Sequence, residues 1–147
     1  MILVSKCLAG AFCRYDGGTN LIPEIRRLVE EGLAVTACPE ELGGLPTPRT
    51  PSERCGSLVL NREGQDVTSQ FEAGAQAALQ IALENGCETA VLKARSPSCG
   101  KGCIYNGQFT GELIVGNGVT AELFLRNGID VLTEDEFVQQ KNSASSE

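Results

Sequence analysis

Apolar and polar residues follow two kinds of pattern along this chain. Short apolar runs bounded by turn residues are typical of buried strands, and apolar residues that recur every three or four positions are typical of helices. Runs of the first kind predict strands at residues 2–6, 33–37, 89–94 and 129–132. The second pattern predicts helices at residues 22–31, from 69 to a stop at 85–86, at 119–126 and from 133 onward.

Two of the helix starts carry a capping signal. Ser69 and Thr133 each stand three positions before a glutamate. In a capping box the two side chains bond to each other's backbone N–H groups, which otherwise have no partner in the first turn. The sequence therefore predicts a capping box at the start of both helices.

Three segments fall outside this alternation. Proline and glycine interrupt residues 39–51 so often that no regular element is expected there. Residues 57–60 and 65–67 flank a turn signal at 61–64, which predicts a small hairpin. The polar residues 141–147 are expected to form a tail that frays.

The order of the elements predicts the fold class. Strands that alternate with helices indicate an α/β fold, because each helix crosses over between parallel strands. We expect a single Rossmann-like domain over residues 1–140, with a mostly parallel sheet, helices on both faces and a small β-hairpin insertion, followed by the tail at 141–147. In such folds ligands bind beyond the carboxyl ends of the strands.

Composition narrows the class of protein. Hydrophobic residues make up 41% of the chain, enough for a core. No apolar run approaches the roughly 20 residues that cross a membrane. The N-terminal residues lack the charged region of an export signal, so a cytoplasmic protein with no membrane partner is expected. The formal net charge of -7 argues against extended binding to nucleic acid, whose phosphates favour a basic surface.

The candidate chemistry lies in the cysteines. Histidine, a common base and metal ligand, is absent, and the seven cysteines are an odd number in a chain expected in a reducing compartment. This favours thiol, metal or cluster chemistry over a disulfide framework. Cys7, Cys38 and Cys99 each follow a predicted strand, so we expect them to converge on one edge of the sheet. Three thiolates suit zinc or an iron–sulfur cluster, and a 4Fe-4S cluster with three cysteine ligands keeps one iron open.

The remaining four cysteines are less informative. Cys87 follows a helix stop and is expected to be a small buried hydrophobic residue. Cys13, Cys55 and Cys103 lie in polar or glycine-rich loops, where an auxiliary role and no role both stay open. Cys103 is a candidate fourth ligand, and as such it would close the open iron.

Three separated motifs resemble those of a known family. They read CLAG at 7–10 with RYDG at 14–17, CPE at 38–40 with GGLPTPR at 43–49, and KARSPSCG at 93–100 with IYNG at 104–107. Over residues 1 to about 132 the chain resembles the thiouracil and thiouridine desulfidases. This resemblance implies a 4Fe-4S cluster held by Cys7, Cys38 and Cys99. It also implies a small-molecule substrate, a thiolated pyrimidine base, nucleoside or nucleotide.

The resemblance further implies a carboxylate and a serine in catalysis. Glu40 is the favoured base while Glu41 and Asp16 stay open, and Ser96 is favoured over Ser98 as the catalytic serine. Glu40 would deprotonate water for a hydrolytic, non-redox attack on the carbon that bears sulfur. The products would be the oxo-pyrimidine and sulfide.

Polar, basic and aromatic residues of the same motifs are candidates for substrate binding. These candidates are Arg14, Tyr15, Asp16, Arg49 and Ser98. The basic residues in or beside the motifs, Arg14, Arg49, Lys93, Arg95 and Lys101, suit a phosphate or carboxylate. Solvated side chains or structural ion pairs, such as one between Glu40 and Arg49, explain them equally well. Two other functions stay open, a non-catalytic iron–sulfur or sulfur-carrier protein and a zinc-stabilised binding module.

Overall fold

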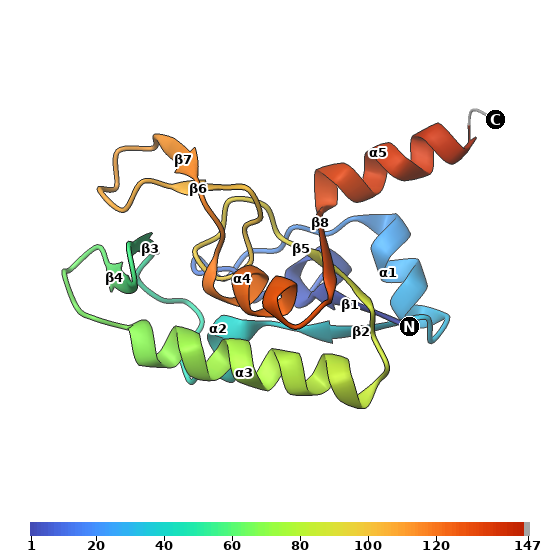
Figure 1. Ribbon diagram of the computed structural model, residues 1–147, viewed down its shortest axis with the longest axis horizontal. Coiled ribbons are helices and arrows are strands. Elements are labelled where there is room, and N and C mark those ends of the chain that lie inside the picture. The colour runs from blue at the N-terminus through green and yellow to red at the C-terminus, as the bar shows by residue number, and fades with distance from the viewer. Residues whose placement is uncertain (146–147) are drawn as a thin grey trace.

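Four parallel strands form the centre of the molecule (Figure 1). The computed structural model describes the backbone of residues 1–145 and the side chains of residues 1–140. The strands are β1 (Ile2–Ser5), β2 (Ala34–Ala37), β5 (Thr89–Leu92) and β8 (Asp130–Thr133). They are ordered β2-β1-β5-β8, and every neighbouring pair is parallel. The predicted α/β fold with a parallel sheet is confirmed.

Helices cover both faces of this sheet, as predicted. Leu3 and Leu92 face a core that also contains Phe124, whereas their neighbours Val4 and Val91 face a second core. Successive residues of a strand point to opposite faces, so each central strand contributes to both cores. The first core is closed by α3 (Thr68–Glu84) and α4 (Val119–Arg126), and the second by α1 (Pro23–Glu30) and α5 (Glu134–Ser145).

A short helix, α2 (Pro39–Leu42), occupies the start of the segment predicted as a loop. The prediction is wrong there because Pro39 sits in the first helical turn, where its fixed φ favours the helix. Glycine lets α2 lie close against α3. A Cβ on Gly43 would overlap the Gln70 carbonyl, and a Cβ on Gly74 would overlap the Pro39 carbonyl.

Two antiparallel hairpins extend from the parallel sheet. β4 (Leu58–Asn61) pairs with β3 (Ser52–Cys55), whereas its predicted partner, residues 65–67, contributes only an isolated bridge. The predicted hairpin partner of β4 is therefore wrong, and β3 takes its place. The sequence of β3, SERC, is polar and gives no strand signal. The second hairpin, β6 (Cys103–Tyr105) with β7 (Leu113–Val115), is not predicted by the sequence pattern.

One of the two predicted capping boxes is present. The Glu136 N–H donates to Thr133 Oγ1 at 3.1 Å, and the Thr133 N–H donates to Glu136 Oε1 at 3.0 Å. The box predicted at Ser69 is wrong, because α3 already begins at Thr68, whose N–H donates to Asp66 Oδ1 at 2.9 Å.

The C-terminal helix α5 runs through Ser145. The backbone at 141–145 is thus helical where a fraying tail is predicted, and residues 146–147 of that tail lie outside the described residues. Within residues 1–145, no helix is both long and apolar enough to cross a bilayer.

Candidate active site

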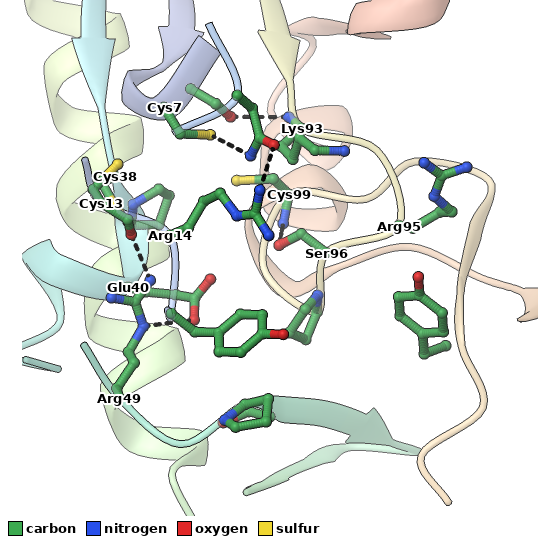
Figure 2. A pocket seen from close by; sticks show the side chains of 18 of the residues that line it. Cys7, Cys13, Arg14, Cys38, Glu40, Arg49, Lys93, Arg95, Ser96 and Cys99 are labelled. Carbon is green, nitrogen blue, oxygen red and sulfur yellow. Dashed lines mark hydrogen bonds and ion pairs between the residues drawn. The ribbon is translucent and has the colours of Figure 1, made fainter. Parts of the chain in front are cut away.

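A cavity of about 540 Å³ opens beyond the carboxyl ends of β1, β2 and β5 (Figure 2). Its inner wall comes from residues that directly follow these strands. Its outer wall comes from β3 and from the segment that includes β6 and the loop after it. Ligands of parallel α/β folds bind at this edge, so the cavity is the candidate site.

Four cysteines line the cavity. Cys7, Cys38 and Cys99 come from three strand ends and meet there, which confirms the predicted convergence. Cys13 joins them although it follows no strand. The chain turns back after the 3-10 helix η1 (Lys6–Ala9) at Gly10, whose φ of 103° favours glycine.

The other three cysteines lie away from the cavity. Cys55 is exposed, Cys103 is half-buried in β6, and Cys87 is buried in the core beneath α3 and α4. None of them lines the cavity in the described part of the chain. Cys103 is therefore not placed to be the fourth ligand, and Cys87 packs as a small hydrophobic residue, as predicted.

Hydrogen bonds set the protonation of two of the thiols. A hydrogen bond with the Cys13 thiol lowers the pKa of Cys7 to about 7, while burial opposes this change. Asn20 Nδ2, 3.5 Å from the Cys7 sulfur, acts in the same direction as Cys13. The Cys13 thiol also lowers the pKa of Cys38, and its own pKa is raised. Both changes favour the thiolate form that metal ligation requires.

Ser96 shapes the loop that carries Cys99. Its Oγ accepts the backbone N–H groups of Ser98 and Cys99, both at 3.1 Å. Ser96 also lines the cavity, and its hydroxyl can still donate its own proton. Burial raises the pKa of Cys99 to about 12, so this thiol keeps its proton until a cation replaces it.

Ser98 does not occupy the predicted place beside a substrate. Its side chain has no exposed surface, and its Oγ lies 2.8 Å from Thr120 Oγ1 in α4. Ser98 is not among the described residues that line the cavity. The substrate-binding role is corrected, because a fully buried hydroxyl with a protein partner joins the Cys99 loop to α4 instead.

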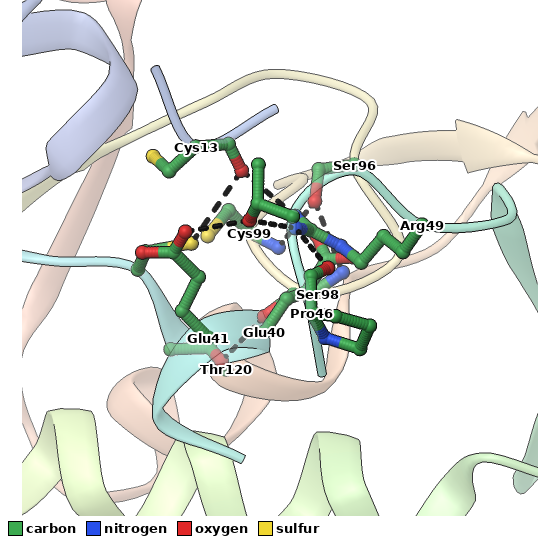
Figure 3. Close-up of polar contacts among 11 residues, drawn as sticks. Cys13, Glu40, Glu41, Pro46, Arg49, Ser96, Ser98, Cys99 and Thr120 are labelled. Carbon is green, nitrogen blue, oxygen red and sulfur yellow. Dashed lines mark hydrogen bonds and ion pairs between the residues drawn. The ribbon is translucent and has the colours of Figure 1, made fainter. Parts of the chain in front are cut away.

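Glu40 and Arg49 form an ion pair at the cavity wall (Figure 3). Arg49 Nε lies 3.2 Å from Glu40 Oε1, and only 6% of the Arg49 side chain and 18% of the Glu40 side chain are exposed. Arg49 also donates to the Cys13 carbonyl at 2.9 Å and to Thr47 Oγ1 at 2.8 Å. Burial raises the pKa of Glu40, and the Arg49 charge opposes this rise. The predicted structural pair is therefore present, and it belongs to the same cavity as the cysteines.

The two other candidate carboxylates lie outside the cavity. Glu41 Oε2 accepts a hydrogen bond from Thr47 Oγ1 at 2.6 Å. Asp16 Oδ2 lies 3.0 Å from Arg14 Nη2 near the protein surface. Arg14 lines the cavity and Asp16 does not in the described structure. Asp16 thus holds Arg14, and its predicted role in substrate binding stays a prediction.

The outer wall contains residues that sequence reasoning missed. Arg62 lies over the Phe109 ring, 5.5 Å from its centroid, and both residues line the cavity. Tyr105 also lines the cavity, as does Tyr15, which the sequence did indicate. The two hairpins bring these segments together, and no local pattern marks the residues.

The basic residues of the motifs differ in their partners. Lys93 lines the cavity, and its Nζ lies 2.7 Å from Glu134 Oε2. Lys101, whose Nζ lies 3.1 Å from Glu136 Oε2, does not line the cavity in the described structure. Arg95 lines the cavity, is exposed and makes no ion pair with any residue that the structure describes. Among these basic motif residues, Arg95 is therefore the one placed to meet an anionic ligand in the described structure.

Comparisons with known proteins agree with this arrangement. A family model described as 2-thiouracil desulfurase matches residues 2–136. The chain is 45% identical over 146 residues to "Uncharacterized protein YbbK" of Bacillus subtilis, a match that covers 92% of this chain and 97% of that protein. It is also similar to the solved structure of a 4Fe-4S-dependent thiouracil desulfidase, TudS. That match has a TM-score of 0.90 and 44% identity, and covers 99% of this chain and 98% of the other.

Proposed function

The chain belongs to the 2-thiouracil desulfurase family, and we propose that it is a 4Fe-4S-dependent enzyme that replaces the sulfur of a thiolated pyrimidine with oxygen. One observation carries this proposal. Three cysteine sulfurs from separate strand ends line the same cavity as a buried carboxylate and a serine hydroxyl. Glu40 and Ser96 supply acid–base groups that a sulfur carrier or a purely structural metal site would not need.

The donor set fits a cluster better than a single ion. A tetrahedral zinc with Zn–S bonds of about 2.3 Å keeps its sulfur ligands roughly 3.8 Å apart. The ligand atoms that lie within 4.8 Å of one another, in the described residues, belong to Cys13, Cys38 and Glu41, and not to the three strand-end cysteines together. Cys7, Cys38 and Cys99 form no such group among the described residues, which favours a ligand larger than one ion. When bound, the cluster supplies a soft Lewis acid for the thione sulfur.

Glu40 is the proposed base. The raised pKa of Glu40 lies closer to neutral pH than that of an ordinary carboxyl group. A general base is most effective when its pKa is near the working pH. Arg49 fixes the carboxylate through Oε1 without removing its basicity entirely. In Figure 2 the Glu40 carboxylate lies between the Arg49 guanidinium and the loop of Ser96. A water molecule held there can lose its proton to Glu40 as it attacks the ring carbon.

Ser96 is the proposed hydrogen-bond donor. Two backbone N–H groups hold the Ser96 oxygen from one side. The hydroxyl proton can therefore point toward a molecule bound in the cavity. We assign it to the departing sulfur or to the attacking water. The reaction is hydrolytic: water supplies the oxygen of the product, sulfur leaves as sulfide, and no electron is transferred.

The outer part of the cavity favours a substrate larger than a free base. Tyr15, Tyr105 and Phe109 offer aromatic faces, while Arg95 and Arg62 add positive charge. Stacking on a ring and a charge-assisted contact with phosphate are the interactions that hold nucleotides. We therefore propose that thiolated pyrimidine nucleotides are substrates in addition to the base.

Anaerobic reconstitution followed by turnover of thiouracil tests the proposal. We expect about four irons per chain, a visible absorbance near 400 nm, roughly where thiolate-to-iron charge transfer falls, and release of uracil and sulfide. Cys7→Ser, Cys38→Ser and Cys99→Ser should each lose the absorbance and the activity, whereas Cys55→Ser should lose neither. A loaded wild-type protein that binds thiouracil without releasing uracil would support the sulfur-carrier alternative, and zinc in place of iron would support the binding module.

A further inference from the structure

Cys13 is the one cavity cysteine that the proposed function does not use. Its side chain is only 4% exposed, so it is not an incidental surface thiol. Its backbone is fixed at the site, because the Cys13 carbonyl accepts a hydrogen bond from Arg49 Nη2 at 2.9 Å. The thiol of Cys38 lies 3.9 Å from the same carbonyl. Cys13 is thus held between the ion pair of Glu40 and Arg49 and the strand-end cysteines.

The sulfur of Cys13 lies near two of the proposed ligands. Cys13 Sγ, Cys38 Sγ and a Glu41 carboxylate oxygen lie within 4.8 Å of one another. The Cys13 thiol is also within hydrogen-bond reach of the Cys7 sulfur, so it can donate to either neighbour. Figure 2 shows the labelled Cys13 beside Cys38, on the opposite side of the cavity from Ser96.

We propose that Cys13 is a positioning residue, whose single S–H group donates a hydrogen bond to the ligand sulfur of Cys38 or of Cys7 and which does not itself bind iron. This inference rests on the proposed cluster. Ligands of one cluster hold different irons and point outward from different corners, so their sulfurs are spread apart. Cys13 instead lies as close to Cys38 as two ligands of a single small ion would, which suits a hydrogen-bond donor to that ligand.

The hydrogen bond from Cys13 would change the electron density of the ligand sulfurs but not the number of ligands. Hydrogen bonds to ligand sulfurs withdraw electron density from the thiolates and raise the reduction potential of a cluster. Partners of this kind also hold the ligands in place, and their loss typically costs about 10–100-fold in metal affinity. Cys13 should therefore affect both the potential and the lifetime of the cluster.

Two variants of Cys13 and one matched control test this role. Cys13→Ala removes the donor, Cys13→Ser keeps one, and Cys87→Ala removes a cysteine of similar burial from the core beneath α3 and α4. After anaerobic reconstitution, Cys13→Ala should keep the wild-type iron content, show a lower reduction potential and lose its cluster to a chelator about 10-fold faster or more. Cys13→Ser should stay near the wild type in both properties, and Cys87→Ala should match the wild type.

Adding a small thiol to the loaded protein shows whether Cys13 is a hydrogen-bond donor or a fourth ligand of the cluster. If Cys13 is a donor, the open iron is already present, so the thiol changes the visible spectrum of wild type and Cys13→Ala alike. A response in Cys13→Ala alone would identify Cys13 as a ligand and overturn the inference. Unchanged potential and cluster lifetime in Cys13→Ala would overturn it as well, because no hydrogen bond would then have been lost.

The metal-free protein distinguishes this inference from the proposed function. The rate at which iodoacetamide alkylates Cys7 and Cys38 is followed across pH by mass spectrometry. Cys13→Ala should shift this pH profile upward, and Cys13→Ser and Cys87→Ala should not. A wild-type protein that takes up no cluster would contradict the proposed function, whereas an unshifted profile in Cys13→Ala would contradict the role of Cys13 alone.

Discussion

Two opposing effects act on Glu40, the residue on which the proposed hydrolysis depends most. Burial raises its pKa above the ordinary value of 4.5, and the neighbouring guanidinium of Arg49 limits this rise. A base works only when deprotonated, so activity should fall as the pH decreases through the raised pKa. The acid limb of the pH profile should therefore lie above 4.5, and single-turnover release of uracil from loaded enzyme measures it.

The variant Glu40→Gln should lose about 10²–10⁴-fold in single-turnover rate while keeping its cluster. The amide has nearly the same shape but cannot accept the proton of water. Glu72→Gln is the matched control, because Glu72 is exposed in α3 and does not line the cavity in the described structure. Wild-type rates in a cluster-loaded Glu40→Gln protein would rule out its role as base and leave it only the ion pair with Arg49.

Arg95 should decide how well a phosphate-bearing substrate binds. It is exposed at the cavity and has no carboxylate partner in the described residues. Arg95→Gln should raise KM for a thiouridine nucleotide by roughly tenfold, as expected for a charge-assisted bond of about 1.5–3 kcal/mol at an exposed site. KM for free thiouracil should stay unchanged. Lys101→Gln is the control, and an equal effect on both substrates would exclude a phosphate contact.

At the scale of elements, the crossing of α2 and α3 places both Cys38 and Glu40. Helix propensity alone predicts that Gly74→Ala stabilises α3 by about 0.5–1 kcal/mol. The added Cβ would, however, overlap the Pro39 carbonyl at the start of α2. Overpacking of this kind typically costs about 1–3 kcal/mol, so destabilisation should win.

Urea unfolding and iron content after reconstitution measure this effect. Gly74→Ala should be less stable than the wild type and should retain less iron, because α2 must move to make room. Ala73→Gly, an exposed change in the same helix, should lose stability through propensity alone and keep its iron. A Gly74→Ala protein as stable as the wild type and fully loaded would show that the crossing does not position the ligands.

The elements also explain which parts of the site were predictable from sequence. The buried strands have strong apolar runs, and the end of a parallel strand is a defined place, so the convergence of Cys7, Cys38 and Cys99 followed from local pattern. Cys13 reaches the cavity through the turn at Gly10 and a bond to Arg49, 36 residues further along the chain. Contacts of that range leave no periodic signal.

The strand β3, the second hairpin and α2 were missed for a related reason. The polar strand β3 forms only because β4 pairs with it, and Arg54 of β3 reaches Glu122 of α4 at 2.6 Å. Its stability thus comes from distant partners and not from its own sequence. In α2, the prolines and glycines that argue against a regular element are used at its first turn and at its contact with α3. For this segment, where each proline and glycine lies in the helix matters more than how many of them there are.

At the scale of the whole molecule, the site is a junction between distant parts of the chain. The two cores on either side of the sheet consist mainly of apolar side chains other than the ligand cysteines, and α5 reaches the site through Glu134, which holds Lys93 Nζ at 2.7 Å. The cavity is lined by residues at the ends of β1, β2 and β5 and by residues in or beside both hairpins. A bound cluster would join these separate segments, so it should stabilise the assembly without creating the fold.

Removal of the cluster should therefore lower Tm but leave the protein folded. A group that binds only the native state stabilises it by mass action, and each kcal/mol corresponds to about 2–4 °C in a chain of this size. Anaerobic thermal unfolding followed by circular dichroism compares loaded and metal-free protein, with Cys38→Ser as a variant that should melt at one temperature under both conditions. An unfolded metal-free protein would mean that the cluster is needed for folding itself, as zinc is in zinc fingers. Equal Tm values for loaded and metal-free wild type would mean that the three strand ends are held by their cores alone.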